Sequence, residues 1–365
     1  MASLALLAAI SVANGFLATP SRPPRVPVAA ADMSCDCAVI GAGPAGSVIA
    51  WLLAERGGLS VALVDPNLDK HWPNNYGVWE AEFNALDAMM PELKLKDCVD
   101  HTWPRTDCFF ETDERRTTLD RPYCRVHRGR LQDKLRRRSD AVGVRRIRAK
   151  VRGDAASWCA NIVDGIRHDV AFGVRRGDGV KWAPPVETLS LTSAQVQGST
   201  LRFDDGRTLR ATSVVDCTGF ESSLTSRQGT GAGPPPTFQV AYGIYGLVEE
   251  ASLAPYAADA MLLFDYRDDH LPVNERDASP SFMYAMPLDL DESTGLRTVF
   301  FEETSLVARP GLPLKELERR TYLRLEHLGV KVVGKHPDEP DELSYIPMGG
   351  SPVVWKSTVK LGLAA

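Results

Sequence analysis

The sequence predicts an α/β fold in which a Rossmann-type parallel sheet, covered by helices, is interleaved with an antiparallel sheet. Two observations carry this prediction. Residues 36–65 follow a strand, helix, strand pattern around three glycines. From Thr237 onward, apolar and aromatic runs succeed one another with short breaks. The first pattern is typical of a parallel βαβ unit and the second of an antiparallel sheet.

Three glycines directly follow the first apolar strand, residues 37–40. Gly41, Gly43 and Gly46 have the spacing G-x-G-x-x-G. Gly41 permits a tight turn, Gly43 lets the backbone approach a pyrophosphate, and Gly46 lets the next helix pack on the strand. The helix N-terminus offers unpaired N–H groups and partial positive charge to phosphates. Together these features predict a dinucleotide site.

An acidic residue ends the second strand of this unit, residues 61–64. Asp65 lies 24 residues after Gly41, where a carboxylate can accept both hydroxyls of an adenosine ribose. A 2′-phosphate, and therefore NADP, is disfavoured here. The early position and the spelling GAGPAG resemble FAD enzymes of the glutathione-reductase and hydroxylase type. An NAD-binding dehydrogenase is the alternative.

Composition excludes several other classes. The chain has 365 residues, 44% hydrophobic and 24% charged, with a net charge of −5. This balance gives no reason to expect a nucleic-acid partner. Residues 121–152 are locally basic, which indicates a solvated helix face or attraction to anionic lipid headgroups. Seven cysteines without CxxC spacing indicate a reducing compartment, and we predict no metal site.

The first 35 residues are typical of a targeting presequence. The apolar run Leu4–Ala13 is too short to span a bilayer, and residues 19–28 hold no acid. Phe16 after a small residue resembles the bipartite presequence of algae with red secondary plastids. We therefore expect a plastid protein, with a plain secretory signal as the alternative.

Eight further segments are similar, in order, to signatures of the plant and algal lycopene cyclases. They are WPNNYGVW (72–79), RPYCRVHR (121–128), DCTGF (216–220), QVAYGI (239–244), FDYRD (264–268), FMYAMP (282–287), FFEETSLVARPG (300–311) and IPMGG (346–350). The resemblance implies a fold like that of FAD hydroxylases and FAD kept reduced by NADPH. It also implies closure of the linear ends of lycopene into β-rings without net redox change.

The pattern and the resemblance together suggest a division of the chain. It comprises a presequence (1–35), the FAD-binding domain in two parts (36–138 and 181–236), a poorly patterned insertion (139–180), a substrate-binding sheet (237–311), and a helix with the return to the FAD domain (312–365).

Ring closure requires a proton donor in an apolar environment. Protonation of a terminal alkene gives a carbocation, and loss of a proton then places the ring double bond. In the strand pattern FFEETSLV, Glu302 and Glu303 point to opposite faces. A carboxyl in an apolar pocket has a raised pKa and can donate its proton. The resemblance assigns the acid and base role to this pair and leaves open which member acts; a surface charge pair is the alternative.

Three further residues resemble positions on the flavin side of FAD enzymes. Arg128 resembles the flavin-contacting arginine of FAD hydroxylases, or is a solvated helix charge. Asp216 and Gly219 resemble the second FAD-side motif, or form a simple turn after a strand.

Aromatic and acidic residues complete the candidate substrate site. Trp72, Tyr76 and Trp79 can stack on polyene or flavin and stabilise a cation, or can pack under a loop. Asp265 and Asp268 can form a buried charge network near the acid, with a surface salt bridge as the default.

The expected partners are lycopene or another carotenoid and the surface of plastid membranes, to which the chain binds peripherally; other carotenoid enzymes stay open as partners. Three rival functions also stay open. These are a lycopene ε-cyclase, an FAD- and NADPH-dependent hydroxylase, and an inactive relic, because the family's pattern continues past residue 350 into a glycine-rich segment that we do not find.

Overall fold

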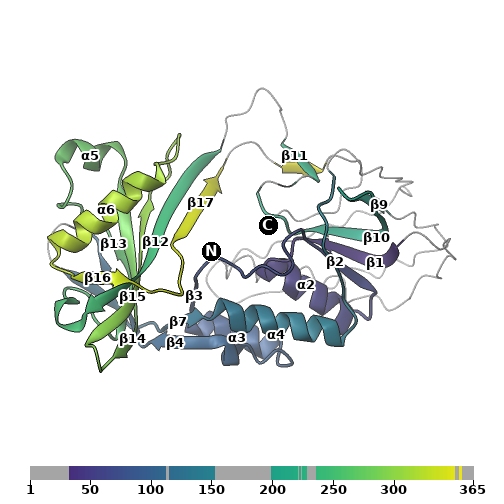
Figure 1. Cartoon of the computed structure of the whole chain (residues 1–365), viewed down its shortest axis with the longest axis horizontal. Helices are drawn as coiled ribbons and strands as arrows, with labels where there is room; N and C mark the ends of the chain where they lie inside the picture. The colour runs from purple at the N-terminus through teal and green to yellow at the C-terminus, as the bar shows by residue number, and fades with distance from the viewer. Residues whose placement is uncertain are drawn as a thin grey trace, which may run out of the picture.

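The computed structural model describes residues 33–111, 115–152, 199–220, 222, 224–227, 236–349 and 353–355. A parallel sheet lies at one end of the molecule and a larger, mostly antiparallel sheet at the other (Figure 1). Two helices, α3 (Glu80–Met89) and α4 (Arg128–Ala141), run along one side between the two ends. The mixed α/β class predicted from the sequence is confirmed.

The parallel sheet, whose edge strand β9 is antiparallel, has the strand order β8-β2-β1-β10-β9. Strand β1 pairs in parallel with β2 and β10, and helix α2 connects β1 to β2. The strand, glycine turn, helix and strand expected for residues 36–65 are therefore present. The bounds are β1 Met33–Ile40, α2 Pro44–Glu55, β2 Val61–Val64, β8 Arg145–Ile147, β9 Ser199–Arg202 and β10 Thr208–Asp216.

Two boundaries differ from those expected. Strand β1 starts at Met33, inside the segment assigned to a presequence, because Met33–Cys35 already pair with β10. The start of the expected insertion, 139–152, contains the end of α4 and strand β8, which extends the parallel sheet beside β2. The rest of that insertion, 153–180, and residues 1–32 lie outside the described residues.

A three-stranded sheet, β3-β7-β4, packs against α3 and α4. Its strands are β3 Tyr76–Trp79, β4 Val99–Trp103 and β7 Tyr123–Val126, and a short 3-10 helix, Leu95–Cys98, precedes β4. Strand β7 ends shortly before Arg128. Helix α4 begins where the Nδ1 atom of His127 accepts the N–H of Arg130, a side-chain cap.

The large sheet has the order β16-β12-β15-β14-β13-β5-β6, and β17 also pairs with β12. The strands expected after Thr237 are present, and they are joined by β5, β6, β16 and β17 from either side of that stretch in the sequence. The bounds are β5 Arg105–Phe109, β6 Arg116–Leu119, β12 Thr237–Glu249, β13 Ala260–Asp265, β14 Ser281–Asp291, β15 Leu296–Ser305, β16 Val332–Lys335 and β17 Glu342–Met348.

The remaining elements are short. Helix α5 (Val273–Ala278) and the 3-10 helix Glu250–Ser252 lie in connections of the large sheet, and β11 (Thr225–Arg227) pairs with β18 (Val353–Trp355). Among the described residues, every helix is too short or too polar to span a lipid bilayer.

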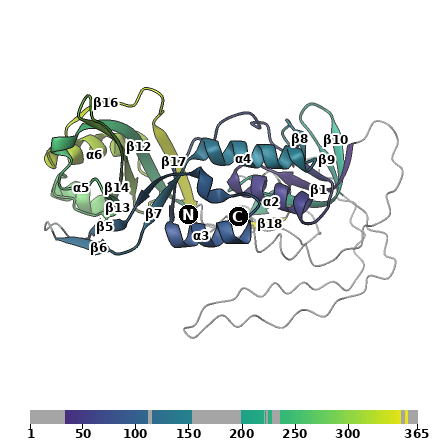
Figure 2. The same ribbon diagram turned by 90° about the horizontal axis from the view of Figure 1, so that it is seen from below.

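The two faces of the large sheet are covered differently. Helix α6 (Leu314–His327) packs on the face that carries Phe301 and Met283. The opposite face carries Phe300, Tyr245 and Met286, and Trp103 of the three-stranded sheet packs against it. Figure 2 shows α6 on the far side of this sheet from α3 and α4. Because side chains alternate along each strand, neighbouring residues of β15 enter two separate environments.

Candidate active site

The glycine loop after β1 is tightly packed at two of its three glycines. Gly41 has φ +102°, and a Cβ there would lie 2.4 Å from the carbonyl oxygen of Cys217. A Cβ on Gly46 would lie 1.9 Å from the carbonyl oxygen of Gly41. A Cβ on Gly43 would meet nothing within 4 Å. Packing therefore requires glycine at 41 and 46, whereas the space in front of Gly43 is open.

Asp65 holds this loop in place. Its Oδ2 accepts the N–H of Ala42 at 2.8 Å, and its Oδ1 accepts the N–H of Asn67 at 2.6 Å. Trp72 adds a third hydrogen bond to this region, because its indole N–H donates to the carbonyl of Ala42 at 2.9 Å. A carboxylate has about four acceptor positions, so Asp65 retains capacity for ribose hydroxyls. Trp72 is buried beside α2, away from the large sheet.

The second predicted cofactor motif lies beside the glycine loop. Asp216 ends β10 directly opposite Ile40, the last residue of β1. Its Oδ1 accepts the N–H and the hydroxyl of Thr218 at 3.0 and 2.6 Å, and the hydroxyl of Ser222 donates to its Oδ2. Gly219 follows with φ +83°. Both motifs thus meet at the carboxyl ends of two parallel strands, where open α/β sheets bind ligands.

This edge fits a dinucleotide pyrophosphate. No side chain of the described residues caps the N-terminus of α2, which begins directly after Gly43. Uncapped helix N–H groups bind phosphate oxygens well.

Arg128, the remaining predicted cofactor residue, is the first residue of helix α4. Its guanidinium donates to Glu339 at 2.5 Å and to the hydroxyl of Tyr245 at 3.3 Å. Arg128 therefore connects helix α4 to the large sheet.

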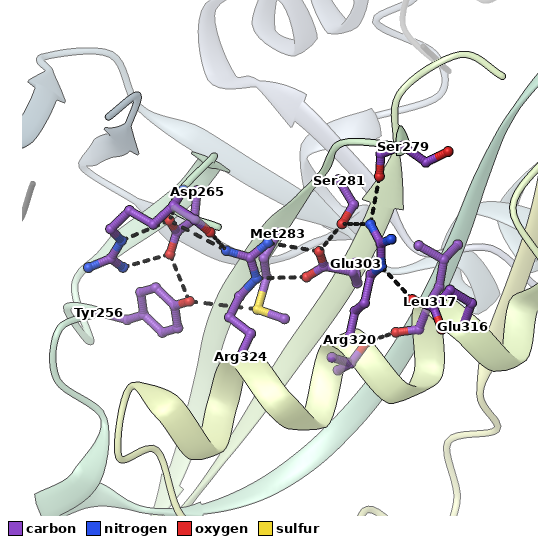
Figure 3. A network of polar contacts seen from close by, with 12 residues as sticks. Tyr256, Asp265, Ser279, Ser281, Met283, Glu303, Glu316, Leu317, Arg320 and Arg324 are labelled. Atoms are coloured by element: carbon purple, nitrogen blue, oxygen red, sulfur yellow. Dashed lines mark hydrogen bonds and ion pairs between the residues drawn. The ribbon is translucent and has the colours of Figure 1, made fainter. Parts of the chain in front are cut away.

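Glu303 lies on the α6 side of the sheet, in a buried ionic network. Arg324 donates to both of its carboxylate oxygens at 2.8 Å, and the hydroxyl of Ser281 donates to Oε1 at 2.7 Å. Glu303 is 0% exposed. Figure 3 shows its carboxylate between these two donors, with Arg320 on the far side of Ser281. Both carboxylate oxygens of Glu303 thus accept from Arg324 in a bidentate ion pair.

Asp265 belongs to the same network and Asp268 does not. Arg267 donates twice to Asp265, at 2.8 and 2.6 Å, and Tyr256 donates at 3.0 Å. Arg324 joins Asp265 to Glu303 at 3.8 Å (Figure 3). Asp268 lies near the surface, 3.7 Å from Arg276. The predicted charge network thus exists, but it surrounds Glu303.

Glu302 faces the other side of the sheet and has no cationic partner among the described residues. The hydroxyl of Thr304 donates to its Oε1 at 3.0 Å. Burial, together with the negative charge of Glu342, raises the pKa of Glu302 to about 7. The side chain is nonetheless partly accessible to solvent. A carboxyl that is half protonated near neutral pH and open on one side can donate a proton.

Four aromatic rings lie beside Glu302 on this face. We call them the aromatic strip: Phe264, Tyr266, Phe282 and Tyr284. Tyr284 is the direct neighbour of Glu302 on the adjacent strand β14. The rings contact one another with centroids 5.0 to 5.7 Å apart. Aromatic faces attract cations, so the strip suits a cationic hydrocarbon next to the acid.

The loop and strand that carry Tyr76 and Trp79 approach the same face. Trp79 packs edge-on against Tyr123 at 5.1 Å, and Arg121 lies 3.9 Å above the ring of Trp79. Burial, followed by the charge of Glu302, raises the pKa of Tyr123 to about 12. Trp79 is thus one ring removed from Glu302, and Tyr76 lies near Glu342.

Sequence reasoning missed three parts of this site: Arg324, Glu342 and the aromatic strip as a unit. Glu342 accepts the N–H of Asn75 at 2.8 Å and the side-chain amide of Asn74 at 3.0 Å. The motif containing Asn74 and Asn75 and the segment before IPMGG are thus in contact. The signal available in the sequence was the position of Glu342, an acid four residues before the IPMGG motif.

These features define a class of protein: a dinucleotide-binding α/β protein whose second sheet presents a partly buried carboxyl beside aromatic rings. A family model described as "Lycopene cyclase protein" matches residues 36–162 and 186–365. The chain belongs to the lycopene cyclase family.

Curated relatives agree with this assignment. The chain is 38% identical over 333 residues to the "Lycopene beta cyclase, chloroplastic" of Nicotiana tabacum and 35% identical to that of Arabidopsis thaliana. It is 36% identical to a "Capsanthin/capsorubin synthase, chromoplastic" of Citrus sinensis. Each match covers 90% of this chain and 54% of the relative. The chain therefore spans about half the length of these relatives.

Solved structures with some similarity include a flavin-dependent brominase, at TM-score 0.48 and 14% identity over 86% of this chain and 68% of the other. Another is a myxobacterial FAD-dependent halogenase, at TM-score 0.47 and 16% identity over 86% and 65%.

Proposed function

We propose that this chain carries the acid site and the cofactor edge of a lycopene β-cyclase. The observation that carries the proposal is the separation of two adjacent glutamates. Glu303 is neutralised by Arg324, whereas Glu302 faces the aromatic strip and has no cationic partner in the described part of the chain. Membership of the family and the names of its relatives support the choice of substrate. An extended hydrocarbon has no heteroatom, so only apolar and aromatic surface can hold it.

In this reaction protonated Glu302 gives its proton to a terminal alkene of the polyene. The adjacent carbon becomes cationic, and the neighbouring double bond attacks it to close a six-membered ring. The strip, beginning with Tyr284, stabilises the positive charge through its ring faces. Loss of a ring proton to the carboxylate of Glu302 restores neutrality, regenerates the acid and places the double bond. Atoms and electrons balance without net oxidation or reduction.

The cofactor in this proposal is FAD, held at the edge formed by β1 and β10. The residues that would hold it are Gly41, Gly43, Gly46, Asp65, Asp216 and Gly219. The open space before Gly43 and the uncapped helix α2 support this assignment. Bound in its reduced form, with NADPH as electron source, the flavin would supply negative charge to a cationic reaction and no net electrons.

We further propose that the protein acts on plastid membranes as a peripheral protein, because its substrate partitions into lipid. The relatives' names include the word chloroplastic, which supports the compartment. A fluorescent reporter fused to residues 1–35 tests the address. Plastid fluorescence is expected, and retention in the secretory pathway would contradict it.

The experiment for the activity is expression in lycopene-accumulating bacteria. Two forms are compared: the chain itself, and the chain followed after residue 349 by the remaining C-terminal length of the tobacco relative. We expect β-carotene from at least the second form. Unchanged lycopene from both forms would contradict the proposal, and δ-carotene would indicate the ε-type cyclase. Stoichiometric consumption of NADPH and O₂ would indicate a hydroxylase instead.

A further inference from the structure

A second carboxyl lies in line with Glu302 on the same face of the sheet. Glu302 in β15 and Glu342 in β17 both pair directly with Gly243 of the strand between them. Residues directly opposite in antiparallel strands point to the same side. Two strand spacings put their backbones roughly 10 Å apart.

The position between the two acids is shaped to exclude a side chain. A Cβ on Gly243 would lie 2.8 Å from the Phe300 ring and 3.2 Å from Cβ of Glu342. The ring of Phe300, which is 2% exposed, therefore leans over Gly243 between the two carboxyl-bearing strands. An apolar ring in this place keeps water from screening the charges of the two acids.

The hydrogen bonds of the two acids differ. Glu342 accepts two N–H donors, the backbone of Asn75 at 2.8 Å and the amide of Asn74 at 3.0 Å. Glu302 accepts one hydroxyl, that of Thr304. Donors favour the ionised form of a carboxyl, so a single negative charge shared by the pair resides on Glu342.

We propose that Glu342 is the ionised carboxylate that keeps Glu302 protonated and ready to donate, and that it also fixes the Asn74–Asn75 loop against the site. Glu342 is thus a positioning residue for the proton donor. The inference rests on the proposed function, because it assigns Glu342 a role through Glu302.

The other titratable groups around the pair do not replace Glu342. Tyr284 from β14 and Tyr123 from β7 face Glu302, and burial raises both of their pKa values, so both are neutral at physiological pH. Tyr76 from β3 faces Glu342, and burial followed by the charge of Glu342 raises its pKa to about 12. Arg128 from α4 is a cation near Glu342, but it is paired with Glu339.

Burial raises the pKa of Glu342 too, and the bonds from Asn75 and Asn74 and the charge of Arg128 oppose that rise. Glu302 has only the Thr304 hydroxyl to oppose its own rise. Pairs of acids whose surroundings separate their pKa values in this way divide into a proton donor and a charged partner.

The test is the pH–rate profile of Glu342→Gln in the active form from the expression experiment. Removing a charge about 10 Å away should move the high-pH loss of activity down by roughly half to one pH unit. Asp341→Asn is the matched control. Asp341 directly precedes Glu342 and carries the same charge. Its carboxylate, however, accepts hydrogen bonds from Tyr242 and Lys335 on the α6 side of the sheet. The control should leave the profile in place.

A uniform fall in rate at every pH, with no shift in the profile, would overturn the inference and leave Glu342 a loop anchor. If Glu342→Gln does not accumulate, Asn74→Ala serves instead. It removes one donor to the Glu342 anion and should shift the profile in the same direction, and an unchanged profile would overturn the inference. Failure of the proposed function is separately visible, because either neither form would then convert lycopene or Glu302→Gln would stay active.

Discussion

Arg324 donates to both carboxylate oxygens of Glu303 at 2.8 Å, and the pair is almost wholly buried, with Arg324 1% exposed. The adjacent Glu302 has no such partner among the described residues. Adjacent residues of β15 thus have different surroundings. Glu303 belongs to a buried ion pair, and Glu302 is the candidate proton donor.

We expect the ion pair to contribute to stability. Arg324→Met should lower the free energy of unfolding by about 3–5 kcal/mol, because it leaves the Glu303 charge buried and unpaired. The matched control is Arg319→Met on the same helix. Arg319 pairs with Glu316 at 2.7 Å at the surface, so its loss should cost less than about 1 kcal/mol. Urea denaturation measures both values. Equal losses in the two variants would contradict the structural role of Glu303.

We expect substitutions in the glycine loop to affect protein stability and flavin binding separately. Gly43→Ala should leave the free energy of unfolding nearly unchanged, since its Cβ meets nothing within 4 Å, yet it should strip the flavin by blocking the pyrophosphate. Gly46→Val should damage the fold itself, because its Cβ would lie 1.9 Å from a carbonyl oxygen.

Gly334→Ala is the control for both variants. It too meets nothing within 4 Å, but it lies in β16, far along the chain from the loop. Flavin content per protein, read from absorbance of the purified variants, checks the prediction. Full flavin content in Gly43→Ala would place the cofactor elsewhere.

Glu302 also predicts a pH dependence of stability. Its folded pKa of about 7 lies above the ordinary value of 4.5. The favourable contribution of the protonated form is therefore complete below about pH 4.5 and is lost as the pH rises through 7. Between pH 5 and pH 8, Glu302→Gln should lose less stability than the wild type. The difference should be about 2 kcal/mol after discounting for partial exposure. Parallel curves for the two proteins would contradict the raised pKa.

Sequence reasoning reached those parts of the molecule that local pattern determines. The glycine loop, its helix and Asp65 are specified by residues within one βαβ unit, and their positions agree with the structure. The opposite orientation of Glu302 and Glu303 also follows from strand geometry alone.

The roles of the two glutamates depend on distant segments. Arg324 comes from a helix after the sheet and Glu342 from a strand further on, and no local period reveals which face each reaches. Strands β5 and β6 join the large sheet by long-range pairing, one of them parallel to β13, so they were not assigned to it. Arg128, which the resemblance assigns to the flavin, bonds Glu339 and Tyr245, and its flavin contact stays a prediction.

The central claim is that Glu302 is the acid that protonates the polyene. The most direct test compares the rate of β-carotene formation by Glu302→Gln with that of the wild type, in the same active form and at matched flavin content. Glutamine keeps the shape and most hydrogen bonds of the side chain but has no acidic proton. We expect the rate to fall by at least ~100-fold while flavin content and folding are retained. A Glu302→Gln variant that cyclises lycopene at nearly the wild-type rate would contradict the account.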